Sequence, residues 1–281
     1  MPFETLVTVE QLAAHLDDPD WIVFDCRHDL VDTAKGERAY RESHIPGAHF
    51  AHLDRDLSGA KTGRNGRHPL PDPAPFADWL GRTGVNETKQ VVAYDDAGGP
   101  FAARLWWMLR WMDHRSVAVL DGGWGAWLQA GQPTTDALPV IVPAHFDGQP
   151  DTSMIIEAAA LESQLTSPEL RLIDARSPDR FRGENETIDP VAGHIPSARN
   201  RFFKDNLGED GRFKPSAELR VAFDLVAGGR LSSEIVSQCG SGVTACHNLL
   251  AMEIAGLSGA RLYPGSWSEW CSDPRRPIAT S

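Results

Sequence analysis

Residues 239–245 read Cys239-Gly240-Ser241-Gly242-Val243-Thr244-Ala245, between an apolar-rich run at 231–236 and a helix-like run at 246–255. This order predicts a strand, then a loop of small residues, then a helix. Glycines allow the loop backbone to fold back on itself, and the positive end of the following helix faces the same loop. Such a loop favours the thiolate form of Cys239 and stabilises an anion attached to its sulfur or facing it. The local sequence therefore indicates a nucleophilic cysteine that handles a small anionic group.

The other three cysteines, Cys26, Cys246 and Cys271, have no donor-rich loop beside them, so we expect them to be small buried hydrophobes. Four cysteines without short pairing spacings favour a reducing compartment over a disulfide scaffold. The chain has no Cys-x-x-Cys and no His-x-x-x-His, which disfavours a zinc site. The scattered histidines His28, His68 and His114 are expected on the surface or in loops.

Charge and length limit the possible partners. The chain has 281 residues and a formal net charge of −12, which argues against nucleic acid and anionic membrane surfaces as partners. No apolar run approaches the length of a membrane span. Residues 1–20 lack the basic-then-apolar pattern of a secretory signal. We therefore expect a cytoplasmic protein.

The two halves of the chain repeat one pattern of landmarks, and this indicates a duplicated domain. In each half an apolar strand ends in Asp-x-Arg, a His-Ile-Pro triplet follows, a second apolar strand comes next, and a Gly/Trp-rich segment closes the pattern. We expect a first domain at 1–131, a linker rich in proline and polar residues at 132–150, and a second domain at 151–281.

Within each half, short apolar strands alternate with helical patterns such as 101–112 and 217–226. This alternation predicts an α/β fold in which each domain is a parallel sheet flanked by helices. Ligands of such sheets bind beyond the carboxyl ends of the strands, where Cys239 is expected. The matching position in the first half is Asp95, and a carboxylate cannot carry a sulfur. The first domain is therefore predicted to be catalytically silent.

The loop at 239–245 resembles the active-site loop of the two-domain rhodanese-like sulfurtransferases, in their mercaptopyruvate form. Five further stretches agree with that family: His44-Ile45-Pro46-Gly47-Ala48, Asp121-Gly122-Gly123-Trp124, Leu172-Ile173-Asp174-Ala175-Arg176, Gly193-His194-Ile195-Pro196 and Tyr263-Pro264-Gly265-Ser266-Trp267. Thiosulfate-type members usually have basic residues just after the cysteine, where this chain has Gly240 and Ser241.

The resemblance implies two tandem rhodanese-like domains and a sulfurtransferase activity. A sulfane sulfur would pass from a small anionic donor, with 3-mercaptopyruvate favoured, to Cys239 as a persulfide. A thiol, cyanide or a thioredoxin-like protein would then accept the sulfur. No metal or organic cofactor is implied, because the persulfide is the carrier. Thiosulfate as the main donor is the alternative.

The resemblance also implies roles for individual residues. Arg180, which precedes a phenylalanine, would bind the donor together with the loop residues Gly240, Gly242, Val243 and Thr244, whereas Arg176 would be structural and pair with a carboxylate. The mercaptopyruvate form has a second donor-binding arginine in the segment that follows. This chain has a shorter segment there with Asp189 at that place, and Arg182 is one possible substitute.

In the mercaptopyruvate form the serine of the loop joins a proton relay with a histidine and an aspartate. The matching residues here are Ser241, His44 and Asp32, and an imidazole suits proton transfer near neutral pH. The alternative for His44 is a hydrogen bond to a nearby backbone carbonyl, because His194 occupies the same place in the second half.

Two other classes of protein agree less well with the sequence. Cysteine phosphatases use Cys-x5-Arg to hold phosphate, but the sixth residue after Cys239 is Ala245. A non-catalytic rhodanese-like binding or regulatory module would be indicated by loss of the cysteine, and Cys239 is present.

Overall fold

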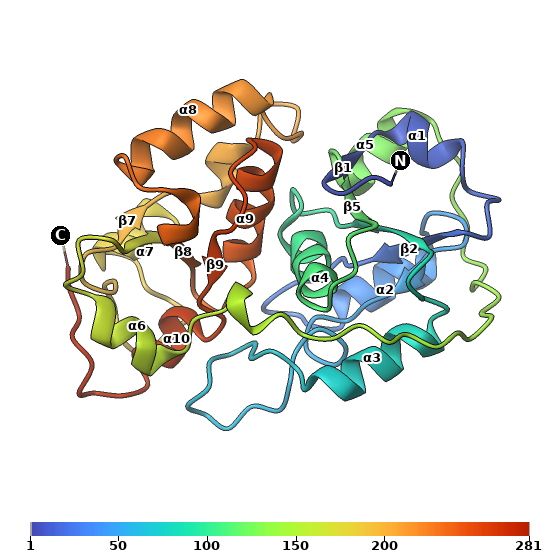
Figure 1. Ribbon diagram of the computed structural model, residues 1–281. Helices are drawn as coiled ribbons and strands as arrows, with labels where there is room; N and C mark the ends of the chain where they lie inside the picture. The colour runs from blue at the N-terminus through green and yellow to red at the C-terminus, as the bar shows by residue number, and fades with distance from the viewer. Residues whose placement is uncertain (1, 281) are drawn as a thin grey trace. The chain divides into compact units, whose positions relative to one another are not determined.

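The computed structural model describes residues 2–280, and these form two compact units (Figure 1). Unit 1 comprises the chain up to Gly59, Pro71–Asp151 and Asp210–Arg212. Unit 2 comprises Ala60–Leu70, Thr152–Glu209 and the chain from Phe213 onward. The segment Ala60–Leu70 therefore belongs to the second unit although it lies in the first half of the sequence. The predicted first domain, 1–131, contains this segment, whereas the structure groups it with unit 2.

Unit 1 is built on a five-stranded parallel sheet with the order β1-β5-β4-β2-β3. Its strands are β1 (Leu6–Val7), β2 (Trp21–Asp25), β3 (His49–Phe50), β4 (Gln90–Tyr94) and β5 (Val117–Leu120). Its helices are α1 (Val9–Ala13), α2 (Lys35–Glu42), α3 (Pro73–Arg82), α4 (Pro100–Trp111) and α5 (Gly123–Gln129).

Unit 2 has a four-stranded parallel sheet with the order β7-β6-β8-β9. Its strands are β6 (Arg171–Asp174), β7 (Arg199–Asn200), β8 (Ile235–Gln238) and β9 (Arg261–Leu262). Its α-helices are α6 (Ala158–Gln164), α7 (Pro178–Arg182), α8 (Ser216–Ala227), α9 (Thr244–Ile254) and α10 (Ser266–Trp270). Short 3₁₀ turns are η1 (Thr152–Met154), η2 (Phe203–Asn206) and η3 (Ser232–Glu234).

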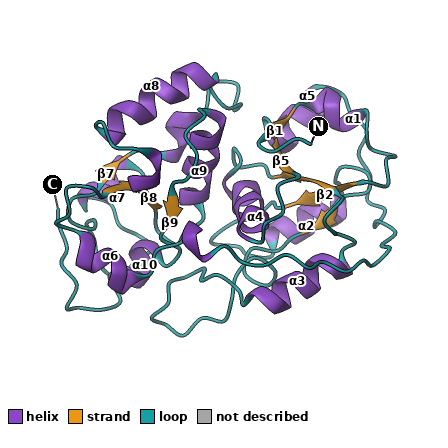
Figure 2. Ribbon diagram, in the orientation of Figure 1, coloured by secondary structure: helices purple, strands orange, loops and turns teal. Residues whose placement is uncertain are grey.

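The sheet of unit 2 is covered on both faces, because successive strand residues point to opposite sides (Figure 2). Leu172 and Val236 belong to a buried cluster with residues of α6 and α10. Their neighbours Ile173 and Ile235 belong to a second cluster with residues of α8 and α9. Apolar residues on both sides are what a parallel sheet with flanking helices requires. The predicted α/β class with two such domains is therefore confirmed.

The strand before Cys239 differs from the prediction. An apolar run at 231–236 was expected to form it, but residues 232–234 form the turn η3 and the strand is Ile235–Gln238. The turn follows from local chemistry: the Glu234 carboxylate accepts the Leu231 backbone N–H, with a distance of 2.7 Å, and closes the turn. The strand therefore ends directly at Cys239. No helix within residues 2–280 has the length and apolar character that a membrane crossing needs.

Candidate active site

Cys239 follows β8 at the carboxyl end of the sheet, and its backbone is fixed by the start of α10. The Cys239 N–H donates to Ser266 Oγ at 3.1 Å, and the Cys239 carbonyl accepts the Trp267 N–H at 3.0 Å. The Gly242 N–H donates to the Cys239 sulfur at 3.1 Å. Cys239 is 2% exposed. The sulfur is thus held at the strand end with a backbone donor directed at it.

Gly242 allows the loop backbone to turn back toward the Cys239 sulfur. Its φ is +80°, and a Cβ added there would overlap the carbonyl oxygen of Pro264. Any other residue would therefore be strained and would displace the loop. Helix α9 begins two residues later at Thr244, so its positive end lies at the loop.

The hydroxyl of Ser241 contacts a histidine that the sequence prediction did not assign to the site. The distance from His68 Nδ1 to Ser241 Oγ is 2.8 Å, and both residues are buried. His68 comes from Ala60–Leu70, the segment that belongs to unit 2. His28, His68 and His114 lie in loops, as one of the two expected alternatives, and all three are buried.

His44 was predicted for that relay, and the structure gives it other partners within unit 1. Its Nδ1 lies 2.6 Å from the Tyr40 carbonyl, and its Nε2 lies 3.1 Å from the Ala137 carbonyl. His194 repeats this arrangement in unit 2, where its Nδ1 lies 2.8 Å from the Phe181 carbonyl. The same place therefore serves the same structural purpose in both units. The histidine at Ser241 is His68 and not His44.

Asp32 was predicted as the third member of the relay. It lies in unit 1, half exposed, and forms an ion pair with Arg38. The hydrogen bond that Arg38 donates to the Asp32 carboxylate holds the pKa of Asp32 below its ordinary value. An exposed carboxylate with its own cation does not resemble a relay member, which is normally buried against its histidine.

Arg180 lies within α7 and is held by two carboxylates. Its Nε and Nη2 donate to Glu186 at 2.8–3.1 Å, and its Nη2 also donates to Asp189 at 3.2 Å. The side chains of Glu186 and Asp189 are each 2% exposed. Burial raises the pKa of Glu186, but the Arg180 hydrogen bond and two backbone N–H groups outweigh it, and the net pKa is lowered.

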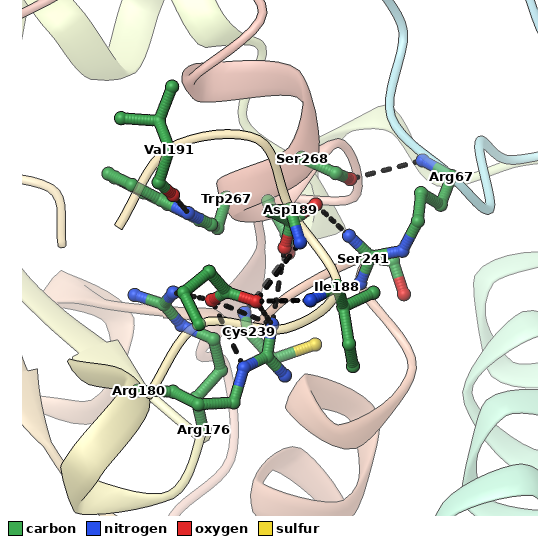
Figure 3. A network of polar contacts seen from close by, with 12 residues as sticks. Arg67, Arg176, Arg180, Ile188, Asp189, Val191, Cys239, Ser241, Trp267 and Ser268 are labelled. Atoms are coloured by element: carbon green, nitrogen blue, oxygen red, sulfur yellow. Dashed lines mark hydrogen bonds and ion pairs between the residues drawn. The ribbon is translucent and has the colours of Figure 1, made fainter. Parts of the chain in front are cut away.

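Asp189 also binds a second arginine, Arg67, through an ion pair with Arg67 Nη1 (Figure 3). The Arg67 backbone N–H donates to Ser268 Oγ at 3.0 Å, which fixes this part of Ala60–Leu70. Burial raises the pKa of Asp189 despite this cation. Arg67 was not among the predicted site residues.

Of the two remaining arginines of this region, Arg176 shares Glu186 with Arg180 through its Nη1, at 3.4 Å, whereas Arg182 has a separate partner. Arg176 donates to Asp174 at 2.7 Å and to the Gly193 carbonyl at 2.7 Å, and its side chain is 1% exposed. Arg182 pairs with Glu184 at 2.7 Å and is 42% exposed. Arg182 is therefore engaged away from the cluster that contains Asp189, and nothing in its contacts supports a substitute role.

In unit 1 the position of the cysteine is filled by Asp95, whose carboxylate is enclosed by backbone donors. Its Oδ1 accepts the N–H groups of Ala97 and Gly99, and its Oδ2 accepts those of Phe101 and Ala102, at 2.8–3.0 Å. Asp95 is buried, and burial raises its pKa although these four bonds oppose the shift. The loop that would hold an anionic sulfur therefore holds its own side chain.

The other cysteines are buried thiols, as expected. Burial raises the pKa of the Cys26 thiol well above its ordinary value and that of Cys271 to about 11. Both thiols therefore stay protonated near neutral pH, and a protonated thiol is a poor nucleophile. Cys246 donates to the Gly242 carbonyl at 3.2 Å.

Two site residues were missed, His68 and Arg67. A signal was present in the composition: residues 61–68 contain Lys61, Arg64, Arg67 and His68 in a chain whose net charge is −12. A basic cluster in an acidic protein suggests an anionic ligand. No pattern singles the segment out as a site, because it has no periodicity and lies in the half without Cys239.

Comparisons with known proteins agree with this architecture. The model of the rhodanese-like domain matches residues 8–130 and 157–273. A probable 3-mercaptopyruvate sulfurtransferase of Pseudomonas aeruginosa is 55% identical over 277 residues, which cover 98% of both chains. A thiosulfate sulfurtransferase of Cricetulus griseus is 34% identical over 279 residues, covering 95% of this chain and 92% of the relative. Among solved structures, the 3-mercaptopyruvate sulfurtransferase of Leishmania major has a TM-score of 0.86 at 31% identity, covering 98% of this chain and 76% of that one.

Proposed function

The chain belongs to the rhodanese-like family and is a sulfurtransferase, and we propose that Cys239 takes a sulfane sulfur from 3-mercaptopyruvate and holds it as a persulfide. The observation that carries this proposal is the loop around Cys239, where the Gly242 N–H reaches the sulfur and the Ser241 hydroxyl lies 2.8 Å from His68. The loop offers both an anion-binding backbone and a group that can deliver a proton.

The reaction has two steps. The Cys239 thiolate attacks the donor sulfur, the carbon–sulfur bond breaks, and its electron pair remains on the carbon as the enolate of pyruvate. Ser241 gives that carbon a proton, and a protonated His68 replaces the proton on the Ser241 hydroxyl. An acceptor thiolate or cyanide then takes the outer sulfur and returns Cys239 as a thiolate.

The charge of the loop favours mercaptopyruvate over thiosulfate. Gly240 and Ser241 carry no cation, so little in the loop compensates a dianion such as thiosulfate. A monoanionic carboxylate needs less compensation, and only its enolate needs a proton. The names of the relatives include both kinds of sulfurtransferase, so the donor is the part of the proposal that needs a direct test.

Initial rates with the two donors, measured side by side with cyanide as acceptor, test this choice. We expect the higher kcat/KM with 3-mercaptopyruvate. Replacing Gly240→Arg together with Ser241→Lys should shift the preference toward thiosulfate, because it adds cations and removes the hydroxyl. A parent enzyme that strongly prefers thiosulfate would show that loop charge does not set specificity in this chain.

Arg180 is proposed to bind the donor carboxylate, and its removal gives a further prediction. We expect Arg180→Ala to lower kcat/KM for both donors by about ten- to a hundredfold, the value of a charge-assisted hydrogen bond. Because Glu186 is buried and loses a partner, thermal unfolding should be followed in parallel. Arg180→Lys keeps the charge and is the matched control. An unchanged kcat/KM in Arg180→Ala would remove Arg180 from the site.

The physiological setting is also proposed. The four cysteines are free, which suits a reducing compartment such as the cytoplasm. A thiol, including that of a thioredoxin-like protein, is then the natural acceptor, because the persulfide on Cys239 is exchanged by thiolate attack.

A further inference from the structure

Three arginines of unit 2 lie at the end of the sheet that is opposite to Cys239. Arg171 and Arg199 are the first residues of the parallel strands β6 and β7, and Arg230 lies between α8 and the turn η3, which leads into β8. Cys239 follows the carboxyl end of β8, and a strand of this length spans about 13 Å. These arginines are therefore separate from the loop around Cys239.

The three guanidinium groups meet at Gly228, the residue that follows α8. A Cβ built on Gly228 would be 3.0 Å from Nη1 of Arg199 and 3.4 Å from Nη2 of Arg171. Nη1 of Arg230 donates to the Gly228 carbonyl oxygen at 3.4 Å. Gly228 and Arg199 are exposed, and the other two arginines are half-buried. All three cations therefore lie close to one exposed point of the backbone.

Part of this arrangement stabilises the carboxyl end of α8. Arg199 Nη1 donates to the Val226 carbonyl at 3.3 Å, and Arg171 Nε donates to the Ala227 carbonyl at 3.1 Å. Cations are favourable at the carboxyl end of a helix. These bonds leave donors unused, because within residues 2–280 Nη2 of each of the three arginines makes no hydrogen bond. Each arginine thus keeps an amino group for a further acceptor.

The positive charge of this cluster is not balanced by a carboxylate. Among residues 2–280, none of the three arginines forms an ion pair, although the chain has 39 acidic and 27 basic residues. Burial lowers the pKa of Arg171, and the charges of Arg199 and Arg230 lower it further. Cations held together repel one another, and an anion between them removes the repulsion. A dianion compensates three cations better than a monoanion does.

We propose that Arg171, Arg199 and Arg230 bind a phosphate or sulfate ion beside Gly228. The planar guanidinium group suits such an ion, because its N–H donors match the spacing of the ion's oxygens. The environment differs from that of Arg180, which is paired with buried carboxylates. The proposal does not depend on the identity of the sulfur donor.

Calorimetric titration with sulfate and with phosphate tests the site, with acetate at equal ionic strength as the monoanion control. Arg180→Ala is titrated beside the parent, so that an ion bound near Cys239 is not mistaken for this one. We expect about one dianion to bind per chain in Arg180→Ala, and acetate to bind at least about tenfold more weakly. Absence of saturable binding in Arg180→Ala, or equal binding of acetate, would overturn the proposal.

A double variant assigns that binding to the cluster. Arg199→Gln with Arg230→Gln keeps amide donors for the backbone carbonyls and removes two charges, and it should weaken sulfate binding about tenfold or more. Arg220→Gln is the matched control, since it removes an arginine of α8 that pairs with Asp224 at 2.9 Å. Its affinity for sulfate should equal that of the parent. An unchanged affinity in the double variant would refute the assignment.

A second pair of variants leaves every arginine in place. Gly228 has a φ of +62°, a conformation that Asp and Asn adopt more readily than most residues. Gly228→Asp supplies a carboxylate against Arg171 and Arg199, whereas Gly228→Asn has the same shape without the charge. We expect the Asp variant to unfold about 2–4 °C above the Asn variant and to gain no stability from sulfate. Because a carboxylate alone is unfavourable at this end of a helix, an equal or lower Tm in the Asp variant would contradict the proposal.

Discussion

Cys239→Ser is expected to abolish sulfur transfer while the protein stays folded. The loop contains no other thiol, and a serine hydroxyl can neither attack the donor sulfur effectively nor form a persulfide. The substitution is nearly isosteric, and the backbone bonds from Cys239 to Ser266 and Trp267 do not involve the sulfur. Initial rates with both donors and thermal unfolding measure the two parts of this prediction.

Intact-protein mass spectrometry supplies the positive evidence. The parent treated with donor should gain one sulfur, located on Cys239 by peptide mapping, and the serine variant should gain none. The buried, protonated thiols Cys26 and Cys271 are internal controls, because their raised pKa values keep them unreactive. Sulfur on one of these, or full turnover in the serine variant, would refute the assignment.

His68→Gln is expected to lower kcat with 3-mercaptopyruvate by about a hundredfold or more, the usual contribution of a general acid or base. Glutamine can keep a hydrogen bond to Ser241 but cannot transfer a proton. Thiosulfate provides the control reaction, because its leaving group, sulfite, departs as an anion and needs no proton. The rate with thiosulfate should therefore fall much less.

Two further variants locate the relay. Ser241→Ala combined with His68→Gln should cost little more than either alone, since both residues deliver one proton. His44→Asn should lower thermal stability, because His44 bonds backbone carbonyls in unit 1, while the ratio of rates with the two donors stays the same. An equal loss with both donors in His68→Gln would mean that His68 only shapes the loop.

Much of the fold could be predicted from the sequence because it rests on local patterns. Glycines and small residues after a strand predict the loop around Cys239, and the repeat of Asp-x-Arg and His-Ile-Pro predicts two similar units. Helices expected at 101–112 and 217–226 are observed as α4 and α8 to within about one residue at each end, as propensity and periodicity allow.

The site was harder to predict because its polar partners come from distant parts of the chain. Ser241 and His68 are 173 residues apart, and Asp189 and Arg67 are 122 apart. No periodicity connects such pairs. At His44 the repeat favoured the structural alternative, because His194 occupies the same place, whereas the relay role came from the resemblance. Asp189 was predicted to be a departure from the resemblance, but Arg67, which pairs with it, could not be located from the sequence.

Asp95 suggests how one copy of a duplicated enzyme can lose its chemistry without losing its structure. Had the cysteine position of unit 1 become alanine or glycine, the buried N–H groups of Gly99, Phe101 and Ala102 would have lost their acceptor, at a cost of about 1–3 kcal/mol each. Aspartate supplies two acceptor oxygens in the same place. The loop of unit 1 is then complete without any ligand, so this domain would remain stable even if it had no catalytic power.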